Sequence, residues 1–255
     1  MRKRFDGRGR ADLHIHTGVG DGMASVPQLL EYIETRTELD VVAFTDHDDL
    51  QGALQAREML CKGRYRFEVV VGEEISSLGG HLLALFIEEP VRPYQTLERT
   101  LEAIHRQNGL CVVPHPLSWL TTSVGERGFK KILVDCASTP GFDGIEVANG
   151  SIAGRVVEER ARRLNRKTYK LAQTGGSDAH FLPLIGSAYT LFDGRTAADL
   201  RRALESRSTR GRRDRSKTMS GVPWSDIVGQ QFRSLVVLPL QRAGIPVQSR
   251  LSEKQ

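Results

Sequence analysis

Short apolar runs alternate along this chain with stretches in which apolar residues recur at helical spacing. The runs predict strands at 11–17, 40–44, 67–71, 81–87, 111–113, 144–148, from 169–172 onward, and at 185–192. The clearest helix is predicted over 94–108, where Leu97, Leu101 and Ile104 form one stripe before Gly109. No helix separates the third and fourth strands, which form either a hairpin or two neighbouring strands. The alternation predicts an α/β protein with a mainly parallel sheet.

Polar residues with metal-binding side chains follow these strands. His14 and His16 share one face of the first strand, where two neutral imidazoles can hold one metal ion. An isolated His-x-His pair is more often packed in a core, but the same position at a strand end is taken by Asp21, His47, Glu73 or Glu74, His81, His115, Asp178 and His180. Only His105 lies elsewhere, on the helix 94–108, and we interpret it as a surface or boundary residue.

The carboxyl ends of parallel strands meet at one edge of a sheet, so these side chains are expected to meet in one cavity. Six histidines and several carboxylates exceed the ligands of a single ion. They predict a cluster of two or three ions in which a carboxylate bridges two of them. Nitrogen and oxygen ligands without a thiolate favour zinc, manganese or iron.

Length and composition limit the class of protein. The 255 residues fit one α/β barrel or one large α/β domain, and 39% hydrophobic with 26% charged residues is typical of soluble globular proteins. No apolar run reaches the roughly 18 residues that cross a bilayer, and no secretory signal follows the basic start. The three cysteines lack the spacing of a disulfide framework or zinc finger. We therefore expect a cytoplasmic protein without a membrane partner.

The basic charge is unevenly distributed. The net charge is +5, with the excess in 2–10, 155–170 and 201–217, which favours anionic ligands such as nucleic acid or smaller phosphorylated compounds. From residue 207 the composition shifts to Arg, Ser, Gly and Lys. The sequence thus predicts one domain over 1–206 and a basic linker with a C-terminal tail over 207–255, in which 232–240 is apolar enough to pack on the barrel.

Six motifs, taken in order, resemble the PHP (polymerase and histidinol phosphatase) family. They are Asp-Leu-His-Ile-His-Thr, Phe-Thr-Asp-His-Asp, Gly-Glu-Glu-Ile-Ser, the Gly-His before Leu-Leu-Ala-Leu-Phe, Val-Pro-His-Pro and Gly-Ser-Asp-Ala-His. The resemblance runs from Asp12 to Phe192 and implies a distorted seven-stranded β/α barrel with a trinuclear metal site and phosphoesterase activity. It is strongest to the small stand-alone phosphoesterases that act on nucleotides and short oligonucleotides.

The resemblance also implies nine metal ligands distributed over two or three divalent ions. The first ion would be held by His14, His16, Glu74 and Asp178. Glu74, rather than Glu73, would bridge to a second ion held by His81 and His115. The third ion would be held by Asp21, His47 and His180.

The mechanism implied is metal-assisted hydrolysis, in which coordination lowers the pKa of water so that hydroxide attacks phosphorus without a protein nucleophile. Asp48, with Asp12 and Asp46, is placed to orient a ligating imidazole or to carry a proton to the leaving oxygen. Arg155, just after the sixth strand, is placed to hold a substrate phosphate.

The leading hypothesis is thus a phosphatase or phosphodiesterase with a small phosphorylated substrate, a nucleotide or short oligonucleotide, and no protein partner. One alternative is histidinol phosphate phosphatase, which a basic chain fits slightly less well than a multiply charged nucleotide. The other is a non-catalytic, metal-stabilised protein that binds nucleic acid. The arginine runs lack interleaved aromatic residues, which argues against a platform for stacking single strands.

Overall fold

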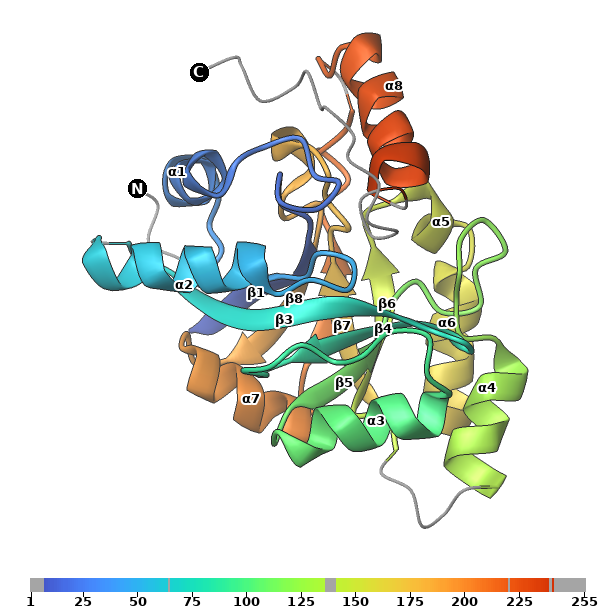
Figure 1. Ribbon diagram of the computed structural model, residues 1–255. Helices are drawn as coiled ribbons and strands as arrows, with labels where there is room; N and C mark the ends of the chain where they lie inside the picture. The colour runs from blue at the N-terminus through green and yellow to red at the C-terminus, as the bar shows by residue number, and fades with distance from the viewer. Residues whose placement is uncertain (1–6, 64, 136–140, 220, 239, 241–255) are drawn as a thin grey trace.

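The protein folds around a curved, nearly closed sheet with helices on its outside, as the computed structural model shows (Figure 1). The structure describes residues 7–63, 65–135, 141–219, 221–238 and 240. Within them the strands follow the order β7-β6-β5-β4-β3-β2-β1-β8-β9. Their bounds are β1 (Arg8–Ile15), β2 (Val41–Phe44), β3 (Glu68–Ser77), β4 (Gly80–Leu85), β5 (Leu110–Val113), β6 (Gly144–Asn149), β7 (Ala172–Gly176), β8 (Ala188–Asp193) and β9 (Arg210–Arg213).

The pairing pattern is that of a distorted barrel. β1, β2 and β3 run parallel, as do β5, β6 and β7, while β4 lies antiparallel between the two groups. Residues after β7 return to β1, where the backbone N–H of His16 donates to the carbonyl of Ala179 at 3.0 Å. The predicted α/β barrel is confirmed, and β8 and β9 add two antiparallel strands beside β1. The third and fourth strands form a hairpin.

Helices cover the outer face of the barrel where their apolar stripes match the strands. α3 buries the predicted stripe of Leu97, Leu101 and Ile104, and its N-cap Thr96 accepts from the N–H of Arg99. Each such side chain contributes roughly 1.5–3 kcal/mol by leaving water. The helices are α1 (Val26–Arg36), α2 (Gln51–Lys62), α3 (Leu97–Arg106), α4 (Glu126–Lys130), α5 (Ile152–Arg155), α6 (Glu158–Leu164), α7 (Ala197–Glu205) and α8 (Trp224–Phe232).

Several predicted boundaries were wrong. The seventh strand begins at Ala172, because the residues before it complete the π-helical turn η2 (Asn165–Tyr169). β3 continues through the two glutamates to Ser77, since its hairpin with β4 pairs the backbone of that motif.

The stretch predicted as a linker contains the edge strand β9. Gly211 is buried while Arg210 and Arg212 are exposed, the alternation of a strand with one face on the barrel. A Cβ on Gly211 would lie 2.2 Å from the carbonyl oxygen of Thr174, so glycine permits this close approach. Composition misled here because only alternate positions of an edge strand need to fit against the core.

The last described elements are helical. α8 continues into the π-helical turn η4 (Arg233–Val237), within the segment 232–240 that the sequence expected to pack on the barrel. The predicted tail from 241 to 255 lies outside the described residues. In the described part of the chain, no helix has the length and apolar character needed to span a membrane.

Candidate metal centre

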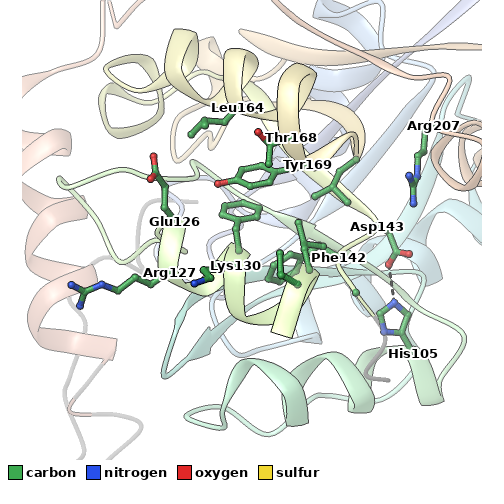
Figure 2. Close-up of a pocket in the computed structure, with 15 residues that line it drawn as sticks. His105, Glu126, Arg127, Lys130, Phe142, Asp143, Leu164, Thr168, Tyr169 and Arg207 are labelled. Atoms are coloured by element: carbon green, nitrogen blue, oxygen red, sulfur yellow. Dashed lines mark hydrogen bonds and ion pairs between the residues drawn. The ribbon is translucent and has the colours of Figure 1, made fainter. Parts of the chain in front are cut away.

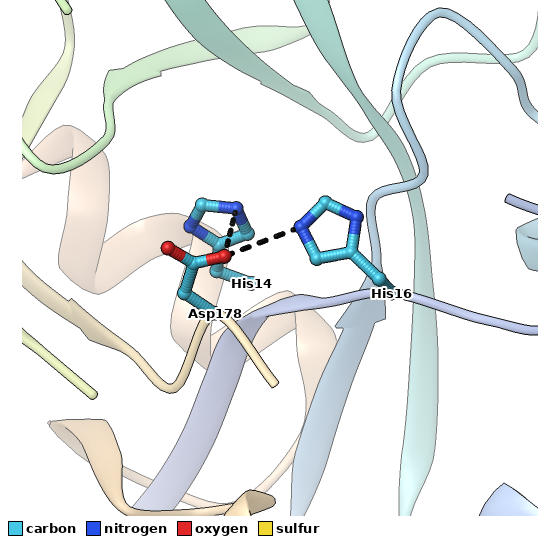
Figure 3. A group of neighbouring side chains, drawn as sticks. All are labelled: His14, His16 and Asp178. Carbon is cyan, nitrogen blue, oxygen red and sulfur yellow. Dashed lines mark ion pairs between the residues drawn. The ribbon is translucent and has the colours of Figure 1, made fainter. Parts of the chain in front are cut away.

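His14 in β1 and His16, one residue beyond its end, point into one cluster with Asp178, which follows β7 (Figure 3). The ring centroids of His14 and His16 lie 5.1 Å apart. One carboxylate oxygen of Asp178 lies 3.6 Å from Nε2 of His14 and 3.4 Å from Nε2 of His16. Strand alternation therefore places both imidazoles on one face, as the sequence predicted, and the bridge from β7 to β1 brings the carboxylate to them.

Glu74 occupies the centre of the cluster. Its carboxylate is 1% exposed and its two oxygens lie 2.9–3.4 Å from ring nitrogens of His14, His16, His47, His81 and His115. His81 reaches this edge because β4 runs antiparallel to β3 and therefore begins where the neighbouring parallel strands end. One carboxylate thus meets five imidazoles from four segments of the chain.

Glu73 points away from the histidines. Adjacent residues of a strand face opposite sides, and the Glu73 carboxylate instead accepts from the backbone N–H of Val91 at 2.6 Å. Burial raises the pKa of Glu73 to about 7. The geometry therefore brings Glu74, rather than Glu73, to the position expected of a bridging ligand.

A further group forms beside His16, around Asp21 and His180. Nε2 of His180 lies 3.1 Å from Oδ2 of Asp21, and the rings of His16 and His180 stack at 4.2 Å. Eight of the nine residues expected as ligands, all but His81, thus lie in overlapping groups, and within each group the donor atoms fall within 4.8 Å of one another. The groups are His14, His16 and Asp178; His14, Glu74 and His115; His16, Asp21 and His180; and His16, His47 and Glu74.

Unsatisfied polar atoms indicate what the cluster is built to bind. Among the described residues, neither ring nitrogen of His16 has a hydrogen-bond partner, nor do Oδ1 of Asp21 and Nδ1 of His81. Buried polar atoms are normally paired, because an unpaired one costs about 1–3 kcal/mol. Nitrogen and carboxylate donors converging in this way fit a divalent cation.

The pKa values agree with a cation site. Burial would raise the pKa of Glu74, but the imidazoles around it, His47 foremost, hold that pKa well below its usual range. Burial lowers the pKa of His47 to about 4. Burial acts in the same direction on His180, yet the adjacent Asp21 outweighs it and raises that pKa to about 9. At neutral pH Glu74 is ionised and His47 neutral, the states in which each can bind a cation.

Glu146, which was not predicted from the sequence, holds the imidazole of His14 and the backbone of His115. Its carboxylate lies 3.2 Å from Nδ1 of His14 and accepts from the backbone N–H of His115 at 2.9 Å. A carboxylate on the second ring nitrogen sets the tautomer, so that Nε2 is free to bind a metal. The signal was present in the sequence: Glu146 is the one charged residue of β6 and lies between Ile145 and Val147.

Asp12 and Asp46 support the backbone rather than the imidazoles. The carboxylate of Asp12 accepts from the backbone N–H groups of Ser177 and Gly186 at 2.8 and 2.7 Å. That of Asp46 accepts from the N–H and the hydroxyl of Thr17, both at 2.6 Å. Burial raises the pKa of each carboxyl to about 6. These two residues hold loops that carry candidate ligands.

Asp48 and Arg155 lie at different distances from the cluster. The Asp48 carboxylate accepts from the backbone N–H of Ser76 at 2.6 Å, on the rim of the hairpin that carries Glu74 and His81. Arg155 is exposed at the end of α5, and within the described part of the chain it makes no hydrogen bond or ion pair to the cluster. The pKa of Arg155 is lowered by partial burial and by the nearby Arg213.

Backbone strain gathers at the same edge. Asp48, His115 and Asp178 have φ values of 51°, 29° and 53°, a region that non-glycine residues rarely adopt. Such conformations cost about 1–3 kcal/mol and persist where the surrounding structure enforces them, often at functional sites. Here Pro114 and Pro116 enclose His115 and fix the chain around it.

A separate cavity of about 940 Å³ opens at the opposite end of the barrel, where β5 and β6 begin (Figure 2). It is lined by His105, Phe129, Lys130, Phe142, Asp143 and Tyr169, among others. The rings of Phe129 and Tyr169 stack at 4.3 Å. None of the clustered histidines lines this cavity.

Fold and site together define an α/β barrel with a buried histidine–carboxylate cluster at the carboxyl ends of its strands. A family model described as PHP-associated matches residues 158–209. An uncharacterised protein of Methanocaldococcus jannaschii is 30% identical over 174 residues, which cover 64% of this chain and 94% of the relative. The chain belongs to the PHP family.

Solved structures show the same fold. A two-domain protein of Bacteroides vulgatus that contains a predicted PHP-like metal-dependent phosphoesterase is 20% identical, with a TM-score of 0.65 over 83% of this chain and 67% of that one. The lesion-specific endonuclease EndoQ of Pyrococcus furiosus is 16% identical, with a TM-score of 0.55 over 80% of this chain and 57% of that one.

Proposed function

We propose that this protein is a metal-dependent phosphoester hydrolase that uses two or three divalent ions. The observation that carries the proposal is the Glu74 carboxylate, buried among five imidazoles with unsatisfied ligand atoms around it. Divalent ions bound there would activate water and offset charge on the phosphoryl oxygens. The ligands would be His14, His16, Asp21, His47, Glu74, His81, His115, Asp178 and His180.

The chain's own residues supply the remaining requirements. Glu146 fixes the ring orientation of His14, and Asp46 holds the turn that follows His16, so the donor atoms are preorganised. Asp48 is proposed to pass a proton to the leaving oxygen from the rim of the site. Arg155 is proposed to bind a phosphate that extends beyond the cluster, since it is exposed and no ion pair in the described structure occupies it.

We further propose a nucleotide or short oligonucleotide as the substrate. The net charge of +5 favours a multiply charged anion, and the fold is shared with a protein named as an endonuclease. Manganese, zinc and iron all suit the mixed nitrogen and oxygen ligands.

The test is phosphate release by Mn²⁺-loaded protein from 5′- and 3′-mononucleotides, 3′,5′-bisphosphorylated nucleotides, short oligonucleotides and histidinol phosphate. A His14→Ala, His16→Ala variant should lose bound manganese and activity together. The matched control is His105→Gln, which changes a histidine outside the cluster and should keep both.

Release from one class of nucleotide that vanishes in the double variant would support the proposal. Preference for histidinol phosphate would replace the substrate class while keeping the chemistry. Full metal content without turnover of any compound would overturn the hydrolase proposal and favour a binding role.

A further inference from the structure

The last described helix meets the loop that carries a proposed ligand. α8 and η4 lie at the same end of the barrel as α1 and α5 (Figure 1). Arg233, the first residue of η4, donates from Nε to the carbonyl of Gly20 at 2.6 Å and from its terminal nitrogen to the carbonyl of Gly18. One planar guanidinium thus holds two backbone oxygens of the loop 18–21.

Gln230 reaches the proposed ligand itself. Its side chain is 5% exposed, and Nε2 donates to Oδ2 of Asp21 at 3.3 Å. The same Oδ2 lies 3.1 Å from Nε2 of His180, while Oδ1 lies 3.4 Å from Nδ1 of His16. An amide donor on Oδ2 fixes the rotation of the carboxylate and leaves Oδ1 directed at His16.

The loop 18–21 needs such an external restraint. Gly18 and Gly20 give it a large conformational freedom, which must be lost when Asp21 is held in one orientation. From the barrel side, the Asp46 carboxylate packs so closely that a Cβ on Gly20 would lie 2.6 Å from it. From the outer side, Arg233 binds the loop carbonyls. The loop is therefore confined between Asp46 and the C-terminal helix.

We propose that Gln230 and Arg233 are positioning residues of the metal centre, which orient Asp21 toward His16 and His180 from the C-terminal helix. The inference rests on the proposed function, because it takes Asp21 as a ligand. The segment after residue 206 would thus take part in the site, because Gln230 and Arg233 contact the side of the loop that faces away from the barrel.

The test is Mn²⁺ binding to the full chain, followed by calorimetric titration and by metal content after dialysis. Gln230→Met keeps the length, burial and helix propensity of the side chain but lacks the amide donor. We expect it to weaken one class of Mn²⁺ site by about 10–100-fold, the usual effect of removing a group that orients a ligand. Arg233→Lys keeps the charge but lacks the planar guanidinium whose separate nitrogens hold the two carbonyls, and it should weaken the same class of site.

The matched control is Val228→Ala, an exposed position on α8 that makes no polar contact with the loop in the described structure. It should bind Mn²⁺ as the unmodified protein does. Melting of each metal-free variant monitors folding, and an unchanged melting temperature with weakened binding identifies positioning rather than general damage. If Gln230→Met fails to fold, the decision rests on Arg233→Lys.

Two further results separate the failures. If both variants bind Mn²⁺ as tightly as the unmodified protein, while a His14→Ala, His16→Ala variant loses it, the positioning proposal falls and the metal centre stands. If the unmodified protein binds no Mn²⁺, the proposed function itself fails, and this inference fails with it.

Discussion

The two ends of the barrel both hold histidines beside carboxylates, but the hydrogen bonding of the ring nitrogens differs between the two ends. At the end where β5 and β6 begin, His105 has a partner on each ring nitrogen: the carbonyl of Leu101 and a carboxylate oxygen of Asp143, both at 2.9 Å. At the other end, neither ring nitrogen of His16 has a hydrogen-bond partner within the described structure, although carboxylates surround it.

The difference separates a structural histidine from a candidate ligand. The His105 pair closes on itself and stabilises the start of β5, because Asp143 also accepts from the backbone N–H of Cys111 at 2.7 Å. In the cluster around Glu74, one carboxylate faces five imidazoles, so its two oxygens cannot be hydrogen-bond partners for all of the ring nitrogens. A buried polar group left over in this way requires a further partner.

The largest effect is expected from substitutions of the two adjacent glutamates of β3. Glu74→Gln removes the charge at the centre of the cluster and should lower phosphoesterase activity by about 100-fold or more, with loss of bound metal. Glu73→Gln keeps an acceptor for the N–H of Val91 and should leave activity within about threefold. Steady-state rates and metal content measure both.

Equal losses in the two variants would contradict the geometry, because they would mean that both carboxylates serve the cluster. The pair is a matched control in itself, since the substitutions are chemically identical and lie on successive residues of one strand.

The chain of strands and the edge at which the site lies could be predicted from sequence, because apolar runs and polar strand ends are local patterns. The spacing of His14 and His16 was sufficient to place both on one face. β9 could not be predicted, because its fit depends on Gly211 meeting the backbone of a strand distant in sequence. The start of the seventh strand was also predicted too early, because periodicity does not reveal the π-helical turn that precedes it.

For the site, residue types at strand ends indicated the residues expected as ligands, with Glu73 and Glu74 as alternatives, and the geometry brings Glu74 and the other eight together. The residues that orient them were harder to find. Glu146 acts through a contact 132 positions away from His14, and Gln230 through one 209 positions away from Asp21. Such partners are defined only once the barrel has closed: the charge of Glu146 within β6 is visible in the sequence, but the histidine that it holds is not.

Metal removal should have an effect of intermediate size, on the stability of the folded protein. A bound ion stabilises the folded state by about 2.7 kcal/mol when its concentration is 100 times its dissociation constant. Chelation should therefore lower the free energy of unfolding in urea by about that amount per ion. His105→Gln should show the same loss, whereas the His14→Ala, His16→Ala variant should show much less. An unfolding curve that chelation leaves unchanged would argue against ion binding at the cluster.

The smallest expected effect lies at the other end, in the pH dependence of the His105 pair. The hydrogen bond to Asp143 raises the pKa of His105 above its usual 6.5. Since the folded pKa exceeds the unfolded one, the charged pair stabilises the fold fully below pH 6.5, and this stabilisation is lost as the pH rises through the folded value. For a partly exposed pair it amounts to about 1 kcal/mol or less.

The measurement is the free energy of unfolding of the unmodified protein minus that of His105→Gln, between pH 6 and pH 9. Titration of the clustered histidines is common to both proteins and cancels in the difference. The difference should fall as the pH rises. A difference that stays constant would show that Asp143 binds a neutral ring and that the pair contributes only a hydrogen bond. We therefore expect the His105 pair to respond to a single proton and the cluster around Glu74 to respond to divalent cations.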